Sequence, residues 1–549
     1  MQQPPYIEVP DSEGACWGGW PAIGHALQQH LQRMGKVKTI LAVECYPGTY
    51  ANIDMGFLKS ALSPNVVCRA EDLFLEENDI RQRIGAAFAK SPRADANLPT
   101  TVASYFDPQK LSSIQETIAA IETGVILVHG VGAHLVATPD VLVYSDVSRY
   151  ELIQRLRRKD ITNIGVDNRE LSHPLQYAWS YFIDWPLGDH IKQELLPNCD
   201  YVLETNNWQR PKMVEGDALR RGFELALQQP LSPSPFFDPE LWDGQGNRNN
   251  PGELSVNFHL RMEEDNLLFK ICDQLLETPV VNLLFCHSSR LLGPEIRDTY
   301  GDRLPFYIQF FDHLQQQLHD INYYPTPAAM VEHFGKTARH QDYYYAVKAR
   351  KNATLLAGGQ AGTAQEQTVA LNLQEMPSEK RWSTLLQALP VKQGAVVAIP
   401  SGMLHSTGTG CQLLNIGIAT PFFRQQLISK KTGQQPHLSI PAAPAALPLQ
   451  SLPPQSGLTQ SLDAEPYEDH FLRLHQLPGG TQLTLPGTGK VRAICIAEGQ
   501  TAQLNYGQGQ TYQLQFGQVV LLPAMLEQIT WNATKGTQAV LIEIRPGQT

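Results

Sequence analysis

Short apolar runs alternate with polar, helix-like stretches over the first 240 or so residues. The runs at residues 39–44, 125–129 and 141–144 are nearly continuous in Val, Ile and Leu. Strands of a parallel sheet that is covered by helices on both faces have this composition, because neither face of the strand meets water. The pattern predicts βαβ units, and therefore an α/β domain with a parallel sheet over residues 1–240.

The hydrophobic pattern changes after a segment rich in Pro, Asn, Gly and Asp at about residues 230–256. From residue 257 onward, apolar strands alternate with Gly and Pro turns, as at residues 394–402, and this is typical of an all-β unit. We expect the first such unit to cover residues 257–431.

A second all-β unit is expected over residues 458–549, where the order of strand, Gly turn, apolar strand and Pro recurs. The segment before it, residues 432–457, is rich in Pro, Ala, Gln and Ser and predicts a linker. The complete pattern therefore predicts an α/β domain followed by two related β-barrels.

Composition restricts the class of protein. The chain has 549 residues, of which 42% are hydrophobic and 18% charged, so it is too apolar for a disordered protein. Asp and Glu outnumber Lys and Arg by 54 to 43, and the net charge of −11 disfavours a nucleic-acid partner.

The eight cysteines show no paired spacing, and the chain shows neither a signal peptide nor an apolar run long enough for a membrane helix. We expect a cytoplasmic protein without a membrane partner, and the oligomeric state stays open.

The turn after the first strong strand is where a nucleotide kinase would bind phosphate. A phosphate-binding loop needs several glycines and a lysine between a strand and a helix. Residues 44–50 contain one glycine and no lysine. Phosphoryl transfer would lack most of its charge stabilisation here, so we assign no nucleotide-binding residues and disfavour an active kinase.

A basic segment follows the later strand of this domain. Residues 139–160 resemble the uridine kinase group, in which an Arg-bearing helix closes over phosphates, and the resemblance extends over residues 37–230. It implies a P-loop-kinase-like fold. The alternative, favoured as regards ATP chemistry, is that the basic side chains form the solvated C-terminal end of a helix. These side chains are Arg155, Arg157, Arg158 and Lys159.

Candidate metal ligands lie on separate predicted strands of the first β-unit. Gln317 and His319 are two residues apart, so on a strand both would point into the barrel. His405 follows the turn at residues 400–402, and Asp342 opens a third strand. Such donors suit one divalent ion, and imidazole favours zinc or a similar metal. By spacing alone, an ordinary buried or exposed histidine is the more frequent explanation.

The region from about residue 279 to residue 545 resembles class I mannose-6-phosphate isomerases, which are zinc-dependent double-cupin enzymes. Residues 317–319 match a Gln-x-His motif of that family, and residues 399–408 match its Pro-x-Gly turn followed by His. The whole chain is similar to a longer bacterial subgroup with a kinase-like front domain. The resemblance implies a sugar-phosphate substrate and a Zn²⁺ ion, or another divalent metal. Its implied ligands are Gln317, His319, Asp342 and His405.

Departures from the family pattern bear on activity. Asp342 stands where the family has Glu, which shortens this ligand by a bond of roughly 1.5 Å. His340 replaces a lysine that many members carry, and is a candidate base or phosphate contact. The family's catalytic-arginine motif is absent after residue 423. The nearest cations for a substrate phosphate, equally well explained as a solvated turn, are Arg424, Lys430 and Lys431.

Two functions follow from these opposing features. The retained Gln-x-His and Pro-x-Gly-x-x-His spacing favours a metal-dependent isomerase that interconverts mannose 6-phosphate and fructose 6-phosphate. The missing Lys and Arg motifs favour a degenerate cupin that binds metal or sugar phosphate as a sensor or interaction protein. We expect the isomerase.

Overall fold

The computed structural model describes most of the chain. The described residues are 6–88, 101–235, 259–260, 265–314, 321–324, 326–328, 331, 340–359, 368–370, 384–406, 408–419, 425–426, 446–448, 459–462, 465–516 and 518–547. Contacts divide the chain into unit 1, which comprises residues 1–226, 234–238 and 263–286, and unit 2, which comprises residues 227–233, 239–262 and 287–549. Residues 263–286 cluster with unit 1, and the domain bounds expected from the sequence stay a prediction.

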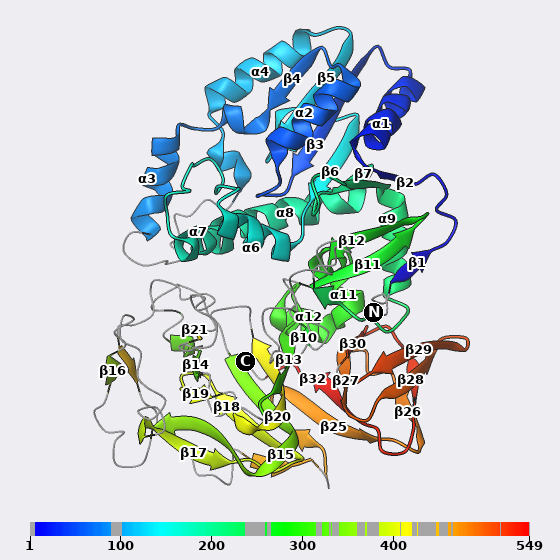
Figure 1. Ribbon diagram of the computed structural model, residues 1–549. Coiled ribbons are helices and arrows are strands. Elements are labelled where there is room, and N and C mark those ends of the chain that lie inside the picture. Colours follow the sequence, from blue (N-terminus) through cyan, green and yellow to red (C-terminus); the bar gives the residue numbers. More distant parts are fainter. Residues whose placement is uncertain are drawn as a thin grey trace. The chain divides into compact units, whose positions relative to one another are not determined.

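A seven-stranded sheet forms the centre of unit 1 (Figure 1), in the order β2-β8-β7-β6-β3-β5-β4. Its strands are β2 (Cys16–Gly18), β3 (Lys38–Cys45), β4 (Val66–Arg69), β5 (Gly124–Gly130), β6 (Val141–Asp146), β7 (Tyr201–Glu204) and β8 (Lys212–Glu215). The five strands from β3 to β7 are parallel, and β8 and β2 add antiparallel pairs at one edge. The predicted α/β character is confirmed, whereas the kinase-like fold stays a prediction.

Helices cover the parallel strands, which explains their continuous apolar sequences. Leu41, Ala42 and Val43 of β3 have no exposed surface. The helices are α1 (Trp20–Met34), α2 (Ala51–Leu62), α3 (Glu77–Phe88), α4 (Pro108–Ala120), α5 (Ala133–Val136), α6 (Arg149–Arg158), α7 (His173–Trp179), α8 (Trp185–Leu195) and α9 (Gly216–Ala226). Short 3₁₀ turns η1 (Ala70–Leu73), η2 (Val102–Tyr105) and η4 (Leu196–Asn198) and a π-helical turn η3 (Ser180–Asp184) complete them.

Helix ends follow local sequence signals. The Asp107 carboxylate accepts hydrogen bonds from the backbone N–H groups of Gln109 and Lys110, and thereby caps α4. Helix α6 is preceded by the N-cap Ser148 and followed by the C-cap Lys159, whose φ of 61° is left-handed. These signals fix the position of α6, which carries the basic side chains.

A small sheet completes unit 1. It contains β1 (Ile7–Val9), β9 (Ser234–Pro235), β11 (Asp265–Ile271) and β12 (Gln274–Pro279). Strand β1 pairs in parallel with β11, so the start of the chain pairs with a segment some 260 residues later. Asn282 donates to Asp146 at the end of β6 across 2.7 Å, which explains why this segment clusters with unit 1. Helix α11 (Val280–Leu292) follows and is kinked at His287, the first residue beyond this segment.

A curled sheet forms the first part of unit 2. Its strands are β10 (His259–Leu260), β13 (Phe306–Asp312), β14 (Ile321–Tyr323), β15 (His340–Gly359), β17 (Leu386–Pro390), β18 (Ala395–Pro400), β19 (His405–Ser406), β20 (Thr409–Ala419), β21 (Gln425–Gln426) and β23 (Thr459–Ser461). The 20-residue strand β15 pairs with β18, β20, β17 and β19 along its length, and its register shifts let the sheet curl. Also in this unit are helix α12 (Pro294–Tyr300) and the pair β16 (Thr368–Ala370) and β22 (Ala446–Pro448).

Two stacked antiparallel sheets form the end of unit 2. One contains β24 (Tyr467–Glu468), β25 (Leu472–Pro478), β27 (Arg492–Glu498), β30 (Val519–Leu522) and β32 (Gln538–Ile544); the other contains β26 (Gln482–Pro486), β28 (Thr501–Tyr506), β29 (Gln510–Gln515) and β31 (Gln528–Ala533). Side chains of both sheets, Trp531 among them, share one apolar core. The all-β prediction for this part of the chain is confirmed. Among the described helices, none combines the length and apolar character needed to cross a membrane.

Candidate functional site

A buried carboxylate lies at one end of the core of the curled sheet. Asp342 is 1% exposed and is paired on β15 with Ile399 of β18 on one side and Gly417 of β20 on the other. It shares its face of β15 with Tyr344 and Ala346, which belong to the apolar core. A charge at such a position needs strong polar partners.

Two imidazoles face one oxygen of this carboxylate. Asp342 Oδ2 lies 3.3 Å from Nε2 of His340 and 3.2 Å from Nε2 of His405. Neither contact has the geometry of a hydrogen bond. His340 opens β15, whereas His405 comes from β19, just beyond the turn at residues 401–402, so the cluster joins segments far apart in the sequence.

The other oxygen of Asp342 accepts two hydrogen bonds. Tyr307 of β13 donates from its hydroxyl group to Oδ1 across 2.8 Å, and Asn415 of β20 donates from Nδ2 across 2.9 Å. Burial by itself raises the pKa of Asp342, but the imidazoles of His340 and His405 outweigh it, and the pKa lies well below its ordinary value of 3.8. The carboxylate is therefore ionised at neutral pH.

Aromatic rings fix the orientation of His340. The ring of Tyr324 stacks on His340 with 3.4 Å between centroids and 17° between planes, and the ring of Tyr307 is stacked at 6.0 Å. The hydroxyl groups of the two tyrosines lie 2.8 Å apart and are hydrogen-bonded. The imidazole is thus held in one plane, with 8% of its side chain exposed.

The tautomer of His405 bears on metal binding. Its Nδ1 lies 3.0 Å from the carbonyl oxygen of Met403, which only accepts, so Nδ1 carries the hydrogen atom. In the neutral imidazole, Nε2 then presents a lone pair to the anionic Asp342 Oδ2, and such a contact is favourable only with a proton or a cation between the two atoms. A histidine held through Nδ1 by a carbonyl is the common arrangement of a metal ligand.

Asp342 and His405 therefore have the chemistry of a partial metal site. Their facing atoms are buried and make no hydrogen bond with any residue that the structure describes. In the described part of the chain, no group of three or more His, Cys, Asp or Glu side chains is arranged to hold an ion. Further donors would have to complete the site, and the two predicted ones, Gln317 and His319, lie outside the described residues.

The structure thus brings three predicted residues together, namely His340, Asp342 and His405. The predicted phosphate contacts Arg424, Lys430 and Lys431 lie outside the described residues. Sequence reasoning missed Tyr307, Tyr324 and Asn415. Asn415 did leave a signal, because it is a single polar residue within the apolar run of residues 413–418. The two tyrosines left none, since tyrosine is frequent in strands.

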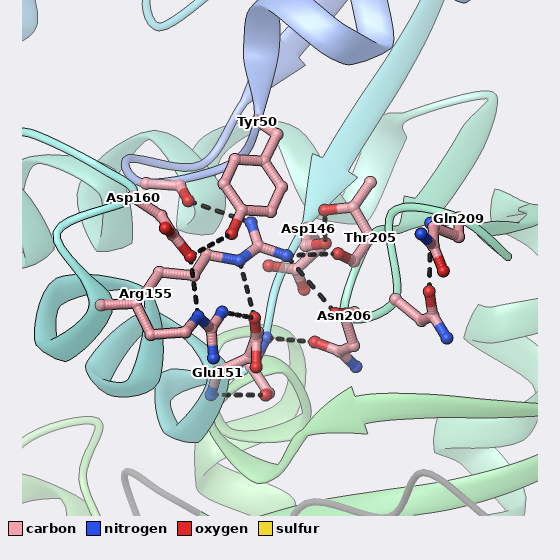
Figure 2. A network of polar contacts seen from close by, with 12 residues as sticks. Tyr50, Asp146, Glu151, Arg155, Asp160, Thr205, Asn206 and Gln209 are labelled. Atoms are coloured by element: carbon pink, nitrogen blue, oxygen red, sulfur yellow. Dashed lines mark hydrogen bonds and ion pairs between the residues drawn. The ribbon is translucent and has the colours of Figure 1, made fainter. Parts of the chain in front are cut away.

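A network of polar contacts centred on Arg155 lies at the carboxyl ends of the unit 1 strands (Figure 2). Arg155 has no exposed surface and donates to the carbonyl oxygens of Gly48 and Thr205 across 3.1 and 2.6 Å. It also pairs with Glu151 across 3.0 Å and lies over the ring of Tyr50. The expectation of a solvated helix end is therefore wrong for Arg155.

The neighbouring basic residues are also paired within the chain. Arg158 contacts Glu151 and Asp160 at 2.9 and 2.7 Å. Lys159 donates to Gln176 across 2.9 Å. Both side chains therefore have partners within the chain.

Two carboxylates accept hydrogen bonds from backbone amides at the start of α5, at the carboxyl end of β5. The N–H groups of Gly132 and His134 donate to Glu44 across 2.6 and 3.0 Å, and that of Val131 donates to Glu71 across 2.9 Å. Amides of this kind bind phosphate in nucleotide sites. Here two acidic side chains accept hydrogen bonds from these amides.

Comparison with known proteins gives one match to a family model and one curated relative of note. The family model, described as "Domain of unknown function (DUF8485)", matches residues 19–228. A mannose-6-phosphate isomerase from Streptococcus mutans serotype c is 30% identical over 94 residues, which is 17% of this chain and 28% of the relative. The chain is similar to mannose-6-phosphate isomerases. The resemblance of unit 1 to uridine kinases stays a prediction.

Solved structures of the same enzyme are also similar. The mannose 6-phosphate isomerase from Bacillus subtilis is 15% identical, with 57% of this chain and 99% of that chain covered and a TM-score of 0.40. The apo form of the mannose 6-phosphate isomerase from Salmonella typhimurium is 12% identical, with 58% and 99% covered and a TM-score of 0.38.

Proposed function

We propose that this protein is a metal-dependent sugar-phosphate isomerase that interconverts mannose 6-phosphate and fructose 6-phosphate. The observation that carries the proposal is the meeting of a buried, ionised Asp342 with His340 and His405 at the polar end of an apolar β core. The 94-residue similarity to a mannose-6-phosphate isomerase supports it. On this proposal, unit 2 contains two cupin domains, and unit 1 is a kinase-like domain without nucleotide-binding residues.

The metal would be Zn²⁺ or another divalent ion, held by Gln317, His319, Asp342 and His405. When bound, it would supply positive charge to the substrate oxygen that becomes negative as the proton moves between C1 and C2. The facing Oδ2 of Asp342 and Nε2 of His405 are the donors on which this assignment depends.

His340 is the candidate base. Nε2 of His340 lies 3.3 Å from the anionic Asp342 Oδ2, whose charge would favour the tautomer with the hydrogen atom on Nε2 and leave Nδ1 to accept the proton of the substrate. Stacking on Tyr324 would keep the ring in place during the transfer. The substrate phosphate would need cations, for which Arg424, Lys430 and Lys431 are proposed.

The alternative is a degenerate cupin that binds metal or sugar phosphate without isomerising it. The missing Lys and Arg motifs favour this function. Both functions are compatible with a bound metal, and they differ in turnover.

Metal analysis of the purified protein together with a coupled assay on mannose 6-phosphate tests the proposal. We expect about one divalent ion per chain and turnover that disappears with a chelator and returns with Zn²⁺. His405→Ala should remove both metal and turnover, whereas His475→Ala, which changes a histidine paired with Glu543 in the last β-unit, should leave both unchanged. Metal without turnover would establish the alternative, and absence of both metal and turnover would remove the metal-dependent isomerase.

A further inference from the structure

We propose that Tyr307 and Asn415 are positioning residues that fix the Asp342 carboxylate, so that Oδ2 alone is presented to the imidazoles and to a metal ion. We call the hydrogen bonds of Tyr307 and Asn415 to Asp342 the clamp. The clamp itself rests on the geometry of the described residues, and its effect on a metal ion rests on the proposed function. Both donors bond to the same oxygen, Oδ1, at 2.8 and 2.9 Å. Two hydrogen bonds to one oxygen define the rotation of the carboxylate about its last bond.

A glycine makes this clamp possible. Tyr307 on β13 and Asp342 on β15 are both register partners of Gly417 on the strand between them, β20. A Cβ atom at Gly417 would lie 2.1 Å from the ring of Tyr307 and 2.5 Å from its hydroxyl oxygen. The ring therefore lies across β20 over a residue without a side chain, and this path lets its hydroxyl reach Asp342 one strand away.

Tyr324 connects the clamp to the imidazole of His340. Tyr307 has one hydroxyl hydrogen, which it donates to Asp342, so in their mutual hydrogen bond Tyr324 is the donor. Tyr324 also stacks on His340, and the N–H of Gly402 donates to its carbonyl oxygen across 2.7 Å. One chain of contacts thus orients both the carboxylate and His340, and it is tied to the turn that precedes His405.

The clamp compensates for the greater freedom with which the Asp342 carboxylate could otherwise offer its oxygens to an ion. A free Asp side chain can offer either or both of its oxygens to an ion, which weakens a site that needs one defined donor. Because Oδ1 is occupied by Tyr307 and Asn415, Asp342 would act as a ligand through a single oxygen. Partners of this kind typically contribute a factor of about 10 to 100 in metal affinity.

Zn²⁺ titration against a competing chelator tests the clamp in the full-length protein. We expect Tyr307→Phe to weaken Zn²⁺ binding about 10- to 100-fold. Gly417→Ala should weaken it by at least as much, and the double variant no more than Gly417→Ala alone, because both act on one contact. Tyr343→Phe is the matched control, since Tyr343 lies next to Asp342 on the opposite face of β15 and donates to Asp469 across 2.6 Å.

A second measurement on metal-free protein separates the clamp from the proposed function. We expect Tyr307→Phe and Asp342→Ala together to lower the urea midpoint of unfolding by less than the sum of their separate effects. Additive effects, or wild-type Zn²⁺ affinity in Tyr307→Phe, would overturn the clamp. Coupling in metal-free protein whose wild type binds no Zn²⁺ would support the clamp and refute the proposed function.

Discussion

At the residue scale, two buried carboxylates differ in what compensates their charge. Asp342 has two imidazoles, a tyrosine hydroxyl and an amide around it, and its pKa is depressed. Asp54 of unit 1 is equally buried, but among the described residues its hydrogen bond is a long one, 3.4 Å from the hydroxyl of Ser145. Burial therefore raises the pKa of Asp54 to about 7, although the positive charge of Arg155 opposes this.

The raised pKa of Asp54 predicts a pH-dependent stability. Because the folded pKa of about 7 exceeds the ordinary 3.8, the contribution is fully present below about pH 4 and is lost as the pH rises through 7. Between pH 4 and pH 8, the wild type should lose about 4 kcal/mol relative to Asp54→Asn. Urea unfolding of both proteins at the two pH values measures this, and a constant difference would contradict it.

The buried contacts of Arg155 predict that its substitution lowers the free energy of unfolding strongly. Its removal leaves the buried carboxylate of Glu151 with fewer partners and two carbonyl oxygens without their donor, so Arg155→Ala should lower the free energy of unfolding by about 3–5 kcal/mol. Arg169→Ala is the control, because Arg169 pairs with Asp167 on the surface and should cost below about 1 kcal/mol. Equal losses in the two variants would show that Arg155 is not the centre of the network.

At the element scale, the sequence predicts strands better than it predicts their partners. Residues 39–44, 125–129 and 141–144 were identifiable as buried strands because apolar side chains cover both faces, and they form β3, β5 and β6. The pairing of β1 with β11, some 260 residues apart in the sequence, has no local signal, nor has the change of partners along β15.

The candidate site was predictable to the same extent. Asp342 and His405 could be identified from their positions in family sequence motifs. The contact of Tyr307 with Asp342 could not, because it depends on both residues being register partners of Gly417, and only the folded sheet defines that register. His340 was identifiable as a substitution at a family position, but not as a ring stacked on Tyr324.

Packing of α1 on α2 gives a prediction at this scale. A Cβ atom at Gly24 of α1 would lie 2.5 Å from the Cβ atom of Ala61, so Gly24→Ala should cost about 1–3 kcal/mol through overpacking. Gly56 of α2 has open space around it, and Gly56→Ala should stabilise the helix by about 0.5–1 kcal/mol. Thermal unfolding of both variants checks the sign, and stabilisation by both would refute the close contact.

At the scale of the whole molecule, the chemistry is divided between two units. In unit 1, Arg155, Glu44 and Glu71 are hydrogen-bonded within the chain. In unit 2, by contrast, Oδ2 of Asp342 and Nε2 of both His340 and His405 face one another without hydrogen bonds in the described part of the chain. Metal addition should therefore act on the unfolding of unit 2.

The change in the free energy of unfolding on addition of Zn²⁺ tests whether the ion binds to unit 2. At a free Zn²⁺ concentration of 100 times its Kd, the transition of unit 2 should gain about 2.7 kcal/mol. His405→Ala should abolish the gain, and Arg155→Lys in unit 1 should leave it intact. A gain of equal size in His405→Ala would place the ion elsewhere.

The location of a bound ion tests the account most directly. Crystals grown with Zn²⁺ and measured on both sides of the zinc absorption edge should show one anomalous peak. The ion at this peak should be coordinated by Oδ2 of Asp342 and Nε2 of His405, with Gln317 and His319 as its remaining ligands. If the peak is absent, or lies away from these atoms while Asp342 and His405 share only a proton, the isomerase account is contradicted.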